Sequence, residues 1–230
     1  ADVPTLDLLF DDIARTAVGT RLSTGTYFDA RGLLSTAAAN VPRVSYDPAT
    51  LLPNGLMLEP ASTNLFLRSQ EFETSWSRFG LLAFGSGSIA NDATAPDGTA
   101  TMDRIVEDTS TGAHGVYKSV AYTNGLSYTI SVYAKAKERS AIYVQLPAAF
   151  FGSNIAYFNL ATGALGTITG GTATICHVGN GIYRCTFTAL CTSGGSNNTL
   201  IRIASPINTT AYTGDGTSGL YLWGAQVEAL

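Results

Sequence analysis

The chain has 230 residues, of which 45% are hydrophobic and only 13% are charged, and its formal net charge is −4. This length can bury a self-sufficient core, and the Lys and Arg residues form no run of the kind that nucleic-acid binding requires. No window approaches the roughly twenty apolar residues of a membrane span, and the acidic start ADVPTLDLLFDDIAR is unlike a secretory signal. Nucleic acid is therefore excluded as a partner, and we expect no membrane insertion.

Residues 1–65 show little sustained hydrophobic periodicity. The stretch from Leu6 to Ile13 has apolar residues at both helical and alternating spacings, so a helix and an extended arm remain open for it. The rest of the segment alternates short apolar runs with Pro, Asn and Gly, which predicts short strands and turns around a small core. Because such a segment buries little apolar area alone, we expect it to lie against a neighbouring domain or subunit.

Residues 66–230 form a series of period-two segments with turn signals about every ten residues, which is typical of a β-sandwich. We therefore predict an all-β fold: an antiparallel β-sandwich, either a jelly roll or a related Greek key, preceded by the extended strand-and-turn segment. No helix is needed after residue 66.

The clearest predicted strand covers residues 127–137 and follows the turn residues Asn124 and Gly125. Further strands are expected over residues 141–146, 155–160, 200–204 and 220–227, and a hairpin over 172–178 and 182–190 turns at Gly179-Asn180-Gly181. The side chains predicted to face the core on the first three strands are Tyr128, Ile130, Val132, Ala134, Ala136, Ile142, Val144, Leu146, Ala156, Phe158 and Leu160.

Sugar binding needs flat aromatic rings that stack on pyranose rings, with amides nearby to hydrogen-bond hydroxyl groups. The alternation predicts several such side chains on strand faces opposite the core, and a tryptophan after a loop-like ETS is the best exposed aromatic candidate. These candidate glycan-binding residues are Trp76, Tyr133, Tyr143, Gln145, Tyr157 and Asn159. The alternative is that the tyrosines line a subunit interface or are partly covered by the N-terminal segment.

No catalytic constellation is visible in the sequence. The two histidines, His114 in a glycine-flanked loop and His177 near a hairpin end, have no accompanying G-x-S-x-G nucleophile motif. A glycosidase would need two convergent carboxylates, but Asp92 and Asp97 read as loop and turn residues and Glu107 as the solvated end of a strand. We therefore predict a non-enzymatic protein without cofactor. The scattered arginines are expected to pair locally or to be solvated, namely Arg68, Arg104, Arg139, Arg184 and Arg202.

Sequence motifs at both ends of the chain resemble those of a known group of proteins. The stretches YFDARGLLSTAAANVPRVSYDP and GLMLEPASTNLFLRSQEFETSWS resemble an N-terminal signature of phage and prophage virion proteins described as head spike, head fiber or tail fiber components. YTGDGTSGLYLWGAQVE, together with VGNGIYRC, resembles the closing part of the same proteins, where a carbohydrate-binding-like jelly roll is expected. The resemblance covers residues 27–228 and implies no set of catalytic residues.

In carbohydrate-binding jelly rolls of this broader type, the segment around EFET often helps to hold a structural calcium together with an acidic group from the last strand. This chain has Glu71 and Glu73 at the first place but Gly224-Ala225 at the second. Because of this departure, no metal site is predicted.

The resemblance implies a structural protein of a phage or phage-like particle, synthesised in the bacterial cytoplasm. Residues 1–65 would attach it to capsid or other virion proteins, and residues 66–230 would bind host surface polysaccharide; a homo-oligomer, with a trimer favoured, is expected for fibers and spikes. Two alternatives remain open: a polysaccharide-degrading enzyme of the tailspike type, and a structural cementing module without a glycan ligand. The three cysteines, an odd number without metal-ligand spacing, agree with synthesis in a reducing compartment.

Overall fold

The computed structural model describes residue 21, residues 24–57 and residues 63–230, and it is 53% strand and 4% helix. The packing divides the chain into two compact units. One comprises Ala1–Ala61 and Pro96–Gly98, and the other comprises Ser62–Ala95 and Thr99–Leu230. The segment at Leu6–Ile13, for which helix and arm were open, lies outside the described residues.

The first unit contains two antiparallel strand pairs, which confirms the expectation of short strands and turns for its described part. The pairs are β1 (Gly25–Phe28) with β2 (Leu34–Ala37) and β3 (Val44–Tyr46) with β4 (Pro53–Leu56). Its buried residues are few, and one of them is Arg43, whose Nη1 donates to the carbonyl oxygen of Thr26 at 2.7 Å.

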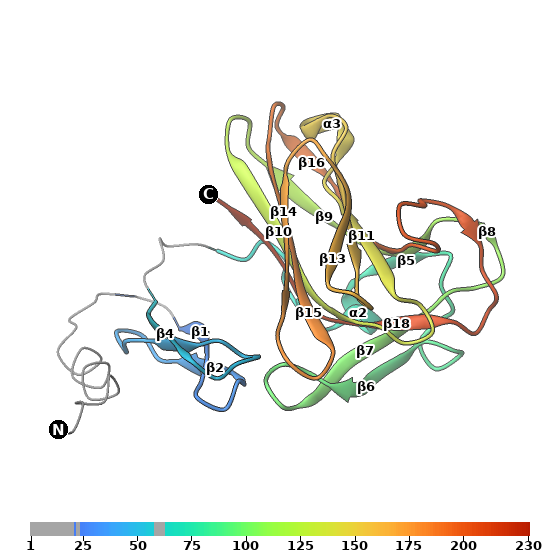
Figure 1. Cartoon of the computed structure of the whole chain (residues 1–230). Coiled ribbons are helices and arrows are strands. Elements are labelled where there is room, and N and C mark those ends of the chain that lie inside the picture. The colour runs from blue at the N-terminus through green and yellow to red at the C-terminus, as the bar shows by residue number, and fades with distance from the viewer. Residues whose placement is uncertain (1–20, 22–23, 58–62) are drawn as a thin grey trace, which may run out of the picture. The chain divides into compact units, whose positions relative to one another are not determined.

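The second unit is an antiparallel β-sandwich of two six-stranded sheets, as the alternation predicts (Figure 1). The β10 sheet has the order β14-β15-β10-β18-β7-β6, and the β11 sheet has the order β13-β12-β11-β16-β9-β5. The strands of the β10 sheet are β6 (Ile89–Thr94), β7 (Ala100–Val106), β10 (Ser127–Lys135), β14 (Thr172–His177), β15 (Ile182–Leu190) and β18 (Gly219–Ala229). Those of the β11 sheet are β5 (Ser77–Phe79), β9 (His114–Tyr122), β11 (Ala141–Gln145), β12 (Ile155–Asn159), β13 (Ala164–Thr169) and β16 (Gly195–Ile203).

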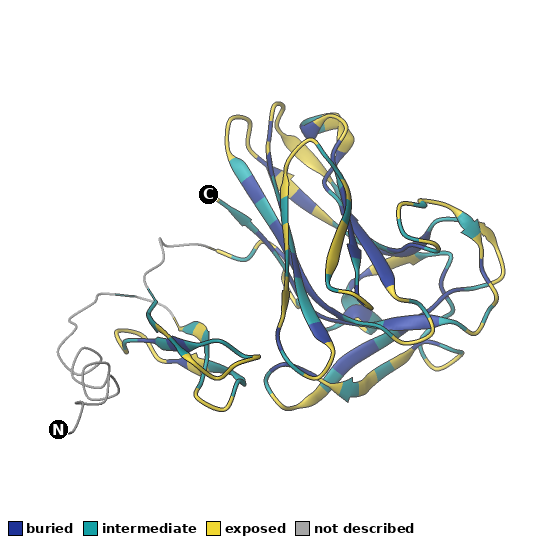
Figure 2. Cartoon of the chain, viewed as in Figure 1, coloured by how far each residue is buried: buried dark blue, intermediate teal, exposed yellow. Residues whose placement is uncertain are grey.

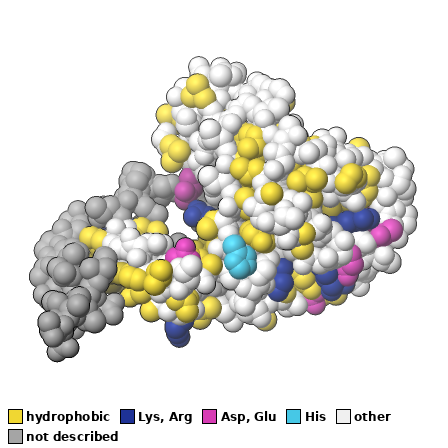
Figure 3. Space-filling view, viewed as in Figure 1, with side chains coloured by type: hydrophobic (Ala, Val, Ile, Leu, Met, Phe, Trp, Pro, Cys, Tyr) yellow, Lys and Arg dark blue, Asp and Glu magenta, His cyan; other side chains and the backbone are white. Residues whose placement is uncertain are grey.

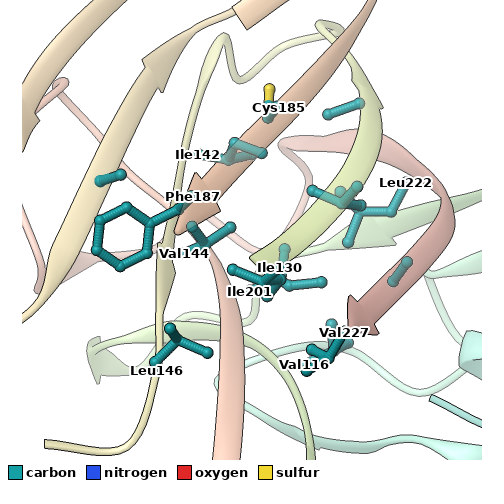
Figure 4. Packing of buried hydrophobic residues seen from close by; sticks show 14 of the residues in the cluster. Val116, Ile130, Ile142, Val144, Leu146, Cys185, Phe187, Ile201, Leu222 and Val227 are labelled. Carbon is teal, nitrogen blue, oxygen red and sulfur yellow. The ribbon is translucent and has the colours of Figure 1, made fainter. Parts of the chain in front are cut away.

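One hydrophobic core fills the space between the sheets (Figure 4). Ile130 of the β10 sheet and Ile142, Val144 and Ile201 of the β11 sheet are fully buried in it. Figure 2 shows the same division, with buried residues along the central strands and exposed ones on the edge strands β13 and β14. All the side chains predicted to face inward from residues 128–134, 142–146 and 156–160 are buried, because alternation assigns sides reliably wherever one face of a strand meets a core.

The predicted hairpin is present as β14 and β15, with Asn180 at φ 52° and Gly181 at φ 72° in its turn. Two short elements were not expected, the helices α2 (Phe72–Ser75) and α3 (Ala148–Phe151), each of four residues. Both are single turns that insert one phenylalanine into the core, Phe72 and Phe151 respectively, and a turn this short leaves no helical periodicity in the sequence. A third small strand pair, β8 (Thr111–Gly112) with β17 (Tyr212–Thr213), lies at one end of the sandwich (Figure 1).

Candidate functional site

Four of the six predicted glycan-binding residues are aromatic and were expected to be exposed, and that expectation is wrong. Tyr143 is 0% exposed, Tyr157 4%, Trp76 5% and Tyr133 6%. Rings this deeply buried have no free face on which a sugar could stack.

Tyr143 and Tyr157 do lie on the outer face of the β11 sheet, as predicted, and their ring centroids are 5.0 Å apart across β11 and β12. The chain that follows β16 covers them. Ala204 and Ile207 pack against the pair, and the Tyr143 hydroxyl donates to the carbonyl oxygen of Thr210 at 3.2 Å. Burial raises the pKa of both tyrosines above the usual value. The cover thus comes from a loop of the same sandwich, which strand alternation cannot foresee.

Tyr133 and Trp76 are buried for different reasons. Tyr133 lies on the outer face of the β10 sheet, where the ring of Trp223 packs 5.4 Å away and the guanidinium of Arg184 lies 6.0 Å above it. Trp76 follows α2 and packs against the rings of Phe66 and Phe72 at 4.6 and 4.9 Å. Both rings therefore stabilise the sandwich.

The two predicted amides are half-buried and lie on the β11 sheet. Asn159 ends β12, and its Oδ1 accepts hydrogen bonds from the backbone N–H groups of Ala161 and Thr162 at 2.9 and 3.2 Å, so it caps a turn. It also lines a hollow of about 260 Å³ together with Glu138 and Ser205. Gln145 ends β11 opposite Leu200 of β16.

An aromatic pair that the sequence interpretation missed lies on the same outer face. Phe79 of β5 and Tyr117 of β9 are stacked, with ring centroids 5.7 Å apart and an interplanar angle of 28°, and both are partly exposed. Phe79 is hard to recognise because β5 has only three residues. Tyr117 was missed because the segment around His114, where β9 begins, was expected to be a loop. The alternation Gly115, Tyr117, Ser119 was the available signal.

Arg202 extends this pair across the sheet. Its guanidinium lies 5.0 Å from the ring centroid of Phe79 and 5.4 Å from that of Tyr143, and Nη1 donates to the Tyr143 hydroxyl at 2.8 Å. Gly115 lies between Arg202 and Phe79 in the register. A Cβ at this position would clash with the backbone oxygen of Ile201 and would be 2.8 Å from Cγ of Arg202, so glycine is required here by the neighbouring backbone and also leaves space for the arginine to lie across β9.

We call this surface the aromatic face: Phe79, Tyr117, Gln145, Leu200 and Arg202. Tyr117, Leu200 and Gln145 form one row across β9, β16 and β11, and Phe79 and Arg202 belong to the next. The residues between them along the strands, such as Val116 and Ile201, point into the core, so the five face outward. The surface combines flat apolar rings, an amide and a guanidinium, which are the groups that bind a sugar.

Two acidic side chains of this part of the sandwich, Glu107 and Asp103, are held by structural partners. Glu107 was expected to be solvated, but it is fully buried and paired with Arg139, and its Oε2 accepts a hydrogen bond from the Tyr212 hydroxyl at 2.6 Å. Asp103, also fully buried, accepts hydrogen bonds from the backbone N–H groups of Phe72 and Asn91. Both carboxylates lie among structural partners below the surface.

The structure also corrects the placement of a histidine. His114 begins β9 instead of lying in a loop, and its buried ring nitrogens lie 2.6 and 3.2 Å from the carbonyl oxygens of Gly80 and Tyr212. The nearby glycines Gly112 and Gly115 suggested a loop, but Gly115 is a strand position opposite Arg202. His177 ends β14 and is exposed, as expected near a hairpin.

The residues of the EFET segment do not fit a calcium site. Glu71 pairs with Arg68 at 2.8 Å, and Glu73 faces Asp103 of β7, whereas Gly224-Ala225 of the last strand offers no side-chain oxygen. Within the described ranges, no three His, Cys, Asp or Glu side chains gather as metal ligands would. The helices of the described part include none long and apolar enough to cross a membrane.

No protein-family model matches the chain, and no curated protein matches it. Among solved structures, it is similar to the enzymatically active domain of tailspike protein 4 of bacteriophage CBA120, with a TM-score of 0.44 and 10% identity over 73% of this chain and 21% of that one. It is also similar to TmCBM27, a carbohydrate-binding module that recognises mannan, with a TM-score of 0.36 and 9% identity over 75% of this chain and 98% of the module. The chain thus spans about a fifth of the tailspike structure.

Proposed function

We propose that this chain is a glycan-binding structural component of a phage or phage-like particle, of the head spike, fiber or decoration kind, and that it binds host surface polysaccharide without cleaving it. The observation that carries the proposal is the aromatic face, where the stacked Phe79 and Tyr117 lie beside Gln145 and Arg202 on an outer sheet surface. The resemblance of both chain ends to virion proteins supplies the particle context.

The division of labour follows the two parts of the chain. Residues 1–65 attach the protein to capsid or other virion proteins and to sister subunits of a homo-oligomer, for which we favour a trimer. The sandwich meets the cell surface. Deleting residues 1–65 is expected to abolish incorporation into particles while the remaining chain still binds glycan. Particles that incorporate the truncated protein at the normal level would contradict this division.

Binding is expected to depend on the exposed rings. The double variant Phe79→Ala/Tyr117→Ala removes both stacking surfaces, and we expect it to weaken binding to host polysaccharide at least tenfold, about 1.4 kcal/mol or more. Isothermal calorimetry with the full chain measures this. Tyr221→Ala is the matched control, because Tyr221 is partly exposed on the other sheet and pairs with Lys135.

Three outcomes separate the proposal from its alternatives. Loss of binding in the double variant with normal binding by Tyr221→Ala supports the aromatic face. New reducing ends after incubation of the pure protein with the polysaccharide would establish an enzyme instead. A glycan array without any signal, for a chain that still forms oligomers, would establish a purely structural cementing module.

A further inference from the structure

We infer that the glycan bound at the aromatic face is acidic, a polysaccharide whose sugars carry carboxylate groups, and that Arg202 recognises the carboxylate. This inference rests on the proposed function and goes further by naming the class of ligand. It starts from the charge state of the surface around Arg202.

Arg202 differs in its partners from three of the arginines considered above. Arg68 pairs with Glu71 at 2.8 Å, Arg104 with Glu138 at 3.1 Å, and Arg139 with Glu107. Across the described part of the chain, no carboxylate lies within 4.0 Å of the Arg202 guanidinium, whose one protein hydrogen bond is to the Tyr143 hydroxyl. The expectation was that each arginine pairs locally or is solvated, and Arg202, which is partly exposed, forms no ion pair with the described residues.

The strands that carry Arg202 and its neighbours lack acidic side chains, and the loop carboxylate of Asp108 lies beside His114, 3.8 Å from its Nδ1. The six strands of the β11 sheet contain three cationic residues, Arg78, Lys118 and Arg202, and no Asp or Glu. From Ser140 to Gly214 the sequence has no acidic residue at all, although the whole chain has a net charge of −4. At the other end of β16, near Gly195, the part of the sandwich around α3 shows only uncharged and hydrophobic side chains on the face seen in Figure 3. A Debye length of about 8 Å at physiological salt leaves the Arg202 charge with little local compensation.

The guanidinium is also held in place before any ligand arrives. It lies over the rings of both Phe79 and Tyr143, and Tyr143 is fixed by the carbonyl oxygen of Thr210. Its Nε is buried, as are those of Arg104 and Arg184, so the terminal Nη1 and Nη2 are the groups that can reach a ligand. Stacking on aromatic rings fixes the plane of a guanidinium while its remaining N–H groups stay available for an anion. A planar fork of donors matches a carboxylate in a bidentate geometry.

Arg184 provides the comparison within the same molecule. It too lies in the acid-free span, on the outer face of the β10 sheet and over a tyrosine, and it makes no ion pair with the described residues. The rings beside it, Tyr133 and Trp223, are buried, so no sugar can stack next to it. Of these two arginines, Arg202 is the one that lies beside a partly exposed ring pair.

The test begins with the full chain on an array of microbial polysaccharides, where we expect the bound polymers to contain uronic or other carboxylated sugars. The carboxyl groups of a bound polymer are then reduced to alcohols, which leaves its linkages intact. We expect the wild-type affinity for the reduced polymer to fall at least tenfold, because a charge-assisted bidentate contact is lost. This measurement needs no variant of the protein.

Variants then assign the effect to one residue. Arg202→Gln is expected to bind the native polymer at least tenfold more weakly and to bind native and reduced polymers equally. Arg202→Lys, which keeps the charge but not the fork, should lie between Arg202→Gln and the wild type. Arg184→Gln should bind as the wild type does, and thermal unfolding of all three checks that they are folded.

Two results would overturn the inference in distinguishable ways. If wild type binds native and reduced polymers equally while Phe79→Ala/Tyr117→Ala loses binding, the site is correct but its ligand is neutral. If the array shows no binding to any polysaccharide, the proposed function fails, and the inference fails with it.

Discussion

Replacing Arg139 with methionine is expected to lower the free energy of unfolding by about 3–5 kcal/mol. The variant leaves the carboxylate of Glu107, which is fully buried, without its cation. Glu107 also accepts hydrogen bonds from the Tyr212 hydroxyl at 2.6 Å and the Asp215 backbone N–H at 2.9 Å. Two neutral donors do not compensate an anion that has lost its charge partner in a region of low dielectric constant.

The arginine also joins loops that are distant in sequence. Nη1 donates to Oγ of Ser205 at 3.1 Å, and Nη2 reaches the carboxylate of Asp215 at 3.3 Å. Urea unfolding measures the loss. The double variant Glu107→Gln/Arg139→Met should recover part of it, because no buried charge is left, and Arg104→Met, whose partner Glu138 is exposed, should cost about 1 kcal/mol or less. An Arg139→Met protein whose free energy of unfolding is within about 1 kcal/mol of the wild-type value, as for a surface ion pair, would contradict the account of this network.

Glu73→Gln is expected to make the protein more stable at neutral pH and to remove much of its pH dependence. Asp103 is fully buried, and burial, together with the neighbouring Glu73 carboxyl group, raises the pKa of Asp103 from 3.8 to about 7. The unfolded chain therefore releases this proton near pH 4, while the folded chain holds it until about pH 7. Stability consequently falls as the pH rises from about 4 to about 7 and is constant above, with a total loss of up to roughly 4 kcal/mol.

A glutamine at position 73 presents an amide N–H to Asp103 instead of a second carboxyl group. The backbone N–H groups of Phe72 and Asn91, at 3.2 and 2.9 Å, then stabilise the ionised aspartate, which lowers its pKa. We expect Glu73→Gln to exceed the wild type by about 1–3 kcal/mol at pH 8 and to match it near pH 4. Glu71→Gln, two positions earlier and paired with Arg68 at the surface, is the control that should leave the slope unchanged. An unchanged slope in Glu73→Gln would refute the coupling of the two acids.

The strands of the sandwich could be predicted from the sequence because each has one face against the hydrophobic core. Ile142, Val144 and Leu146 alternate against one hydrophobic layer, and the structure buries all three. The turn at Asn180 needs residues with positive φ, and the sequence Gly-Asn-Gly supplies residues that adopt it readily. The alternation and the turn each depend on residues that are close together in the chain, so both can be recognised in one sequence.

The site was only partly predictable because it depends on contacts between distant segments. Alternation placed Tyr143 on the correct outer face, but the loop that covers it begins more than sixty residues later, at Ala204. Phe79 belongs to an edge strand of three residues, too short for a period to show, and it meets Arg202 only because Gly115 lies between them in the sheet. Glu107 was misassigned for a related reason, since its partner Arg139 comes from another turn. The unpaired state of Arg202 likewise follows only from the register.

The most direct test of the central claim is chemical-shift mapping of the full chain with the bound polysaccharide. The account predicts the largest perturbations at the aromatic face, in the Phe79 and Tyr117 rings, the Gln145 amide and the Arg202 guanidinium. Perturbations confined to the outer face of the β10 sheet, around Thr186 and Gln226, with an unchanged aromatic face, would contradict it.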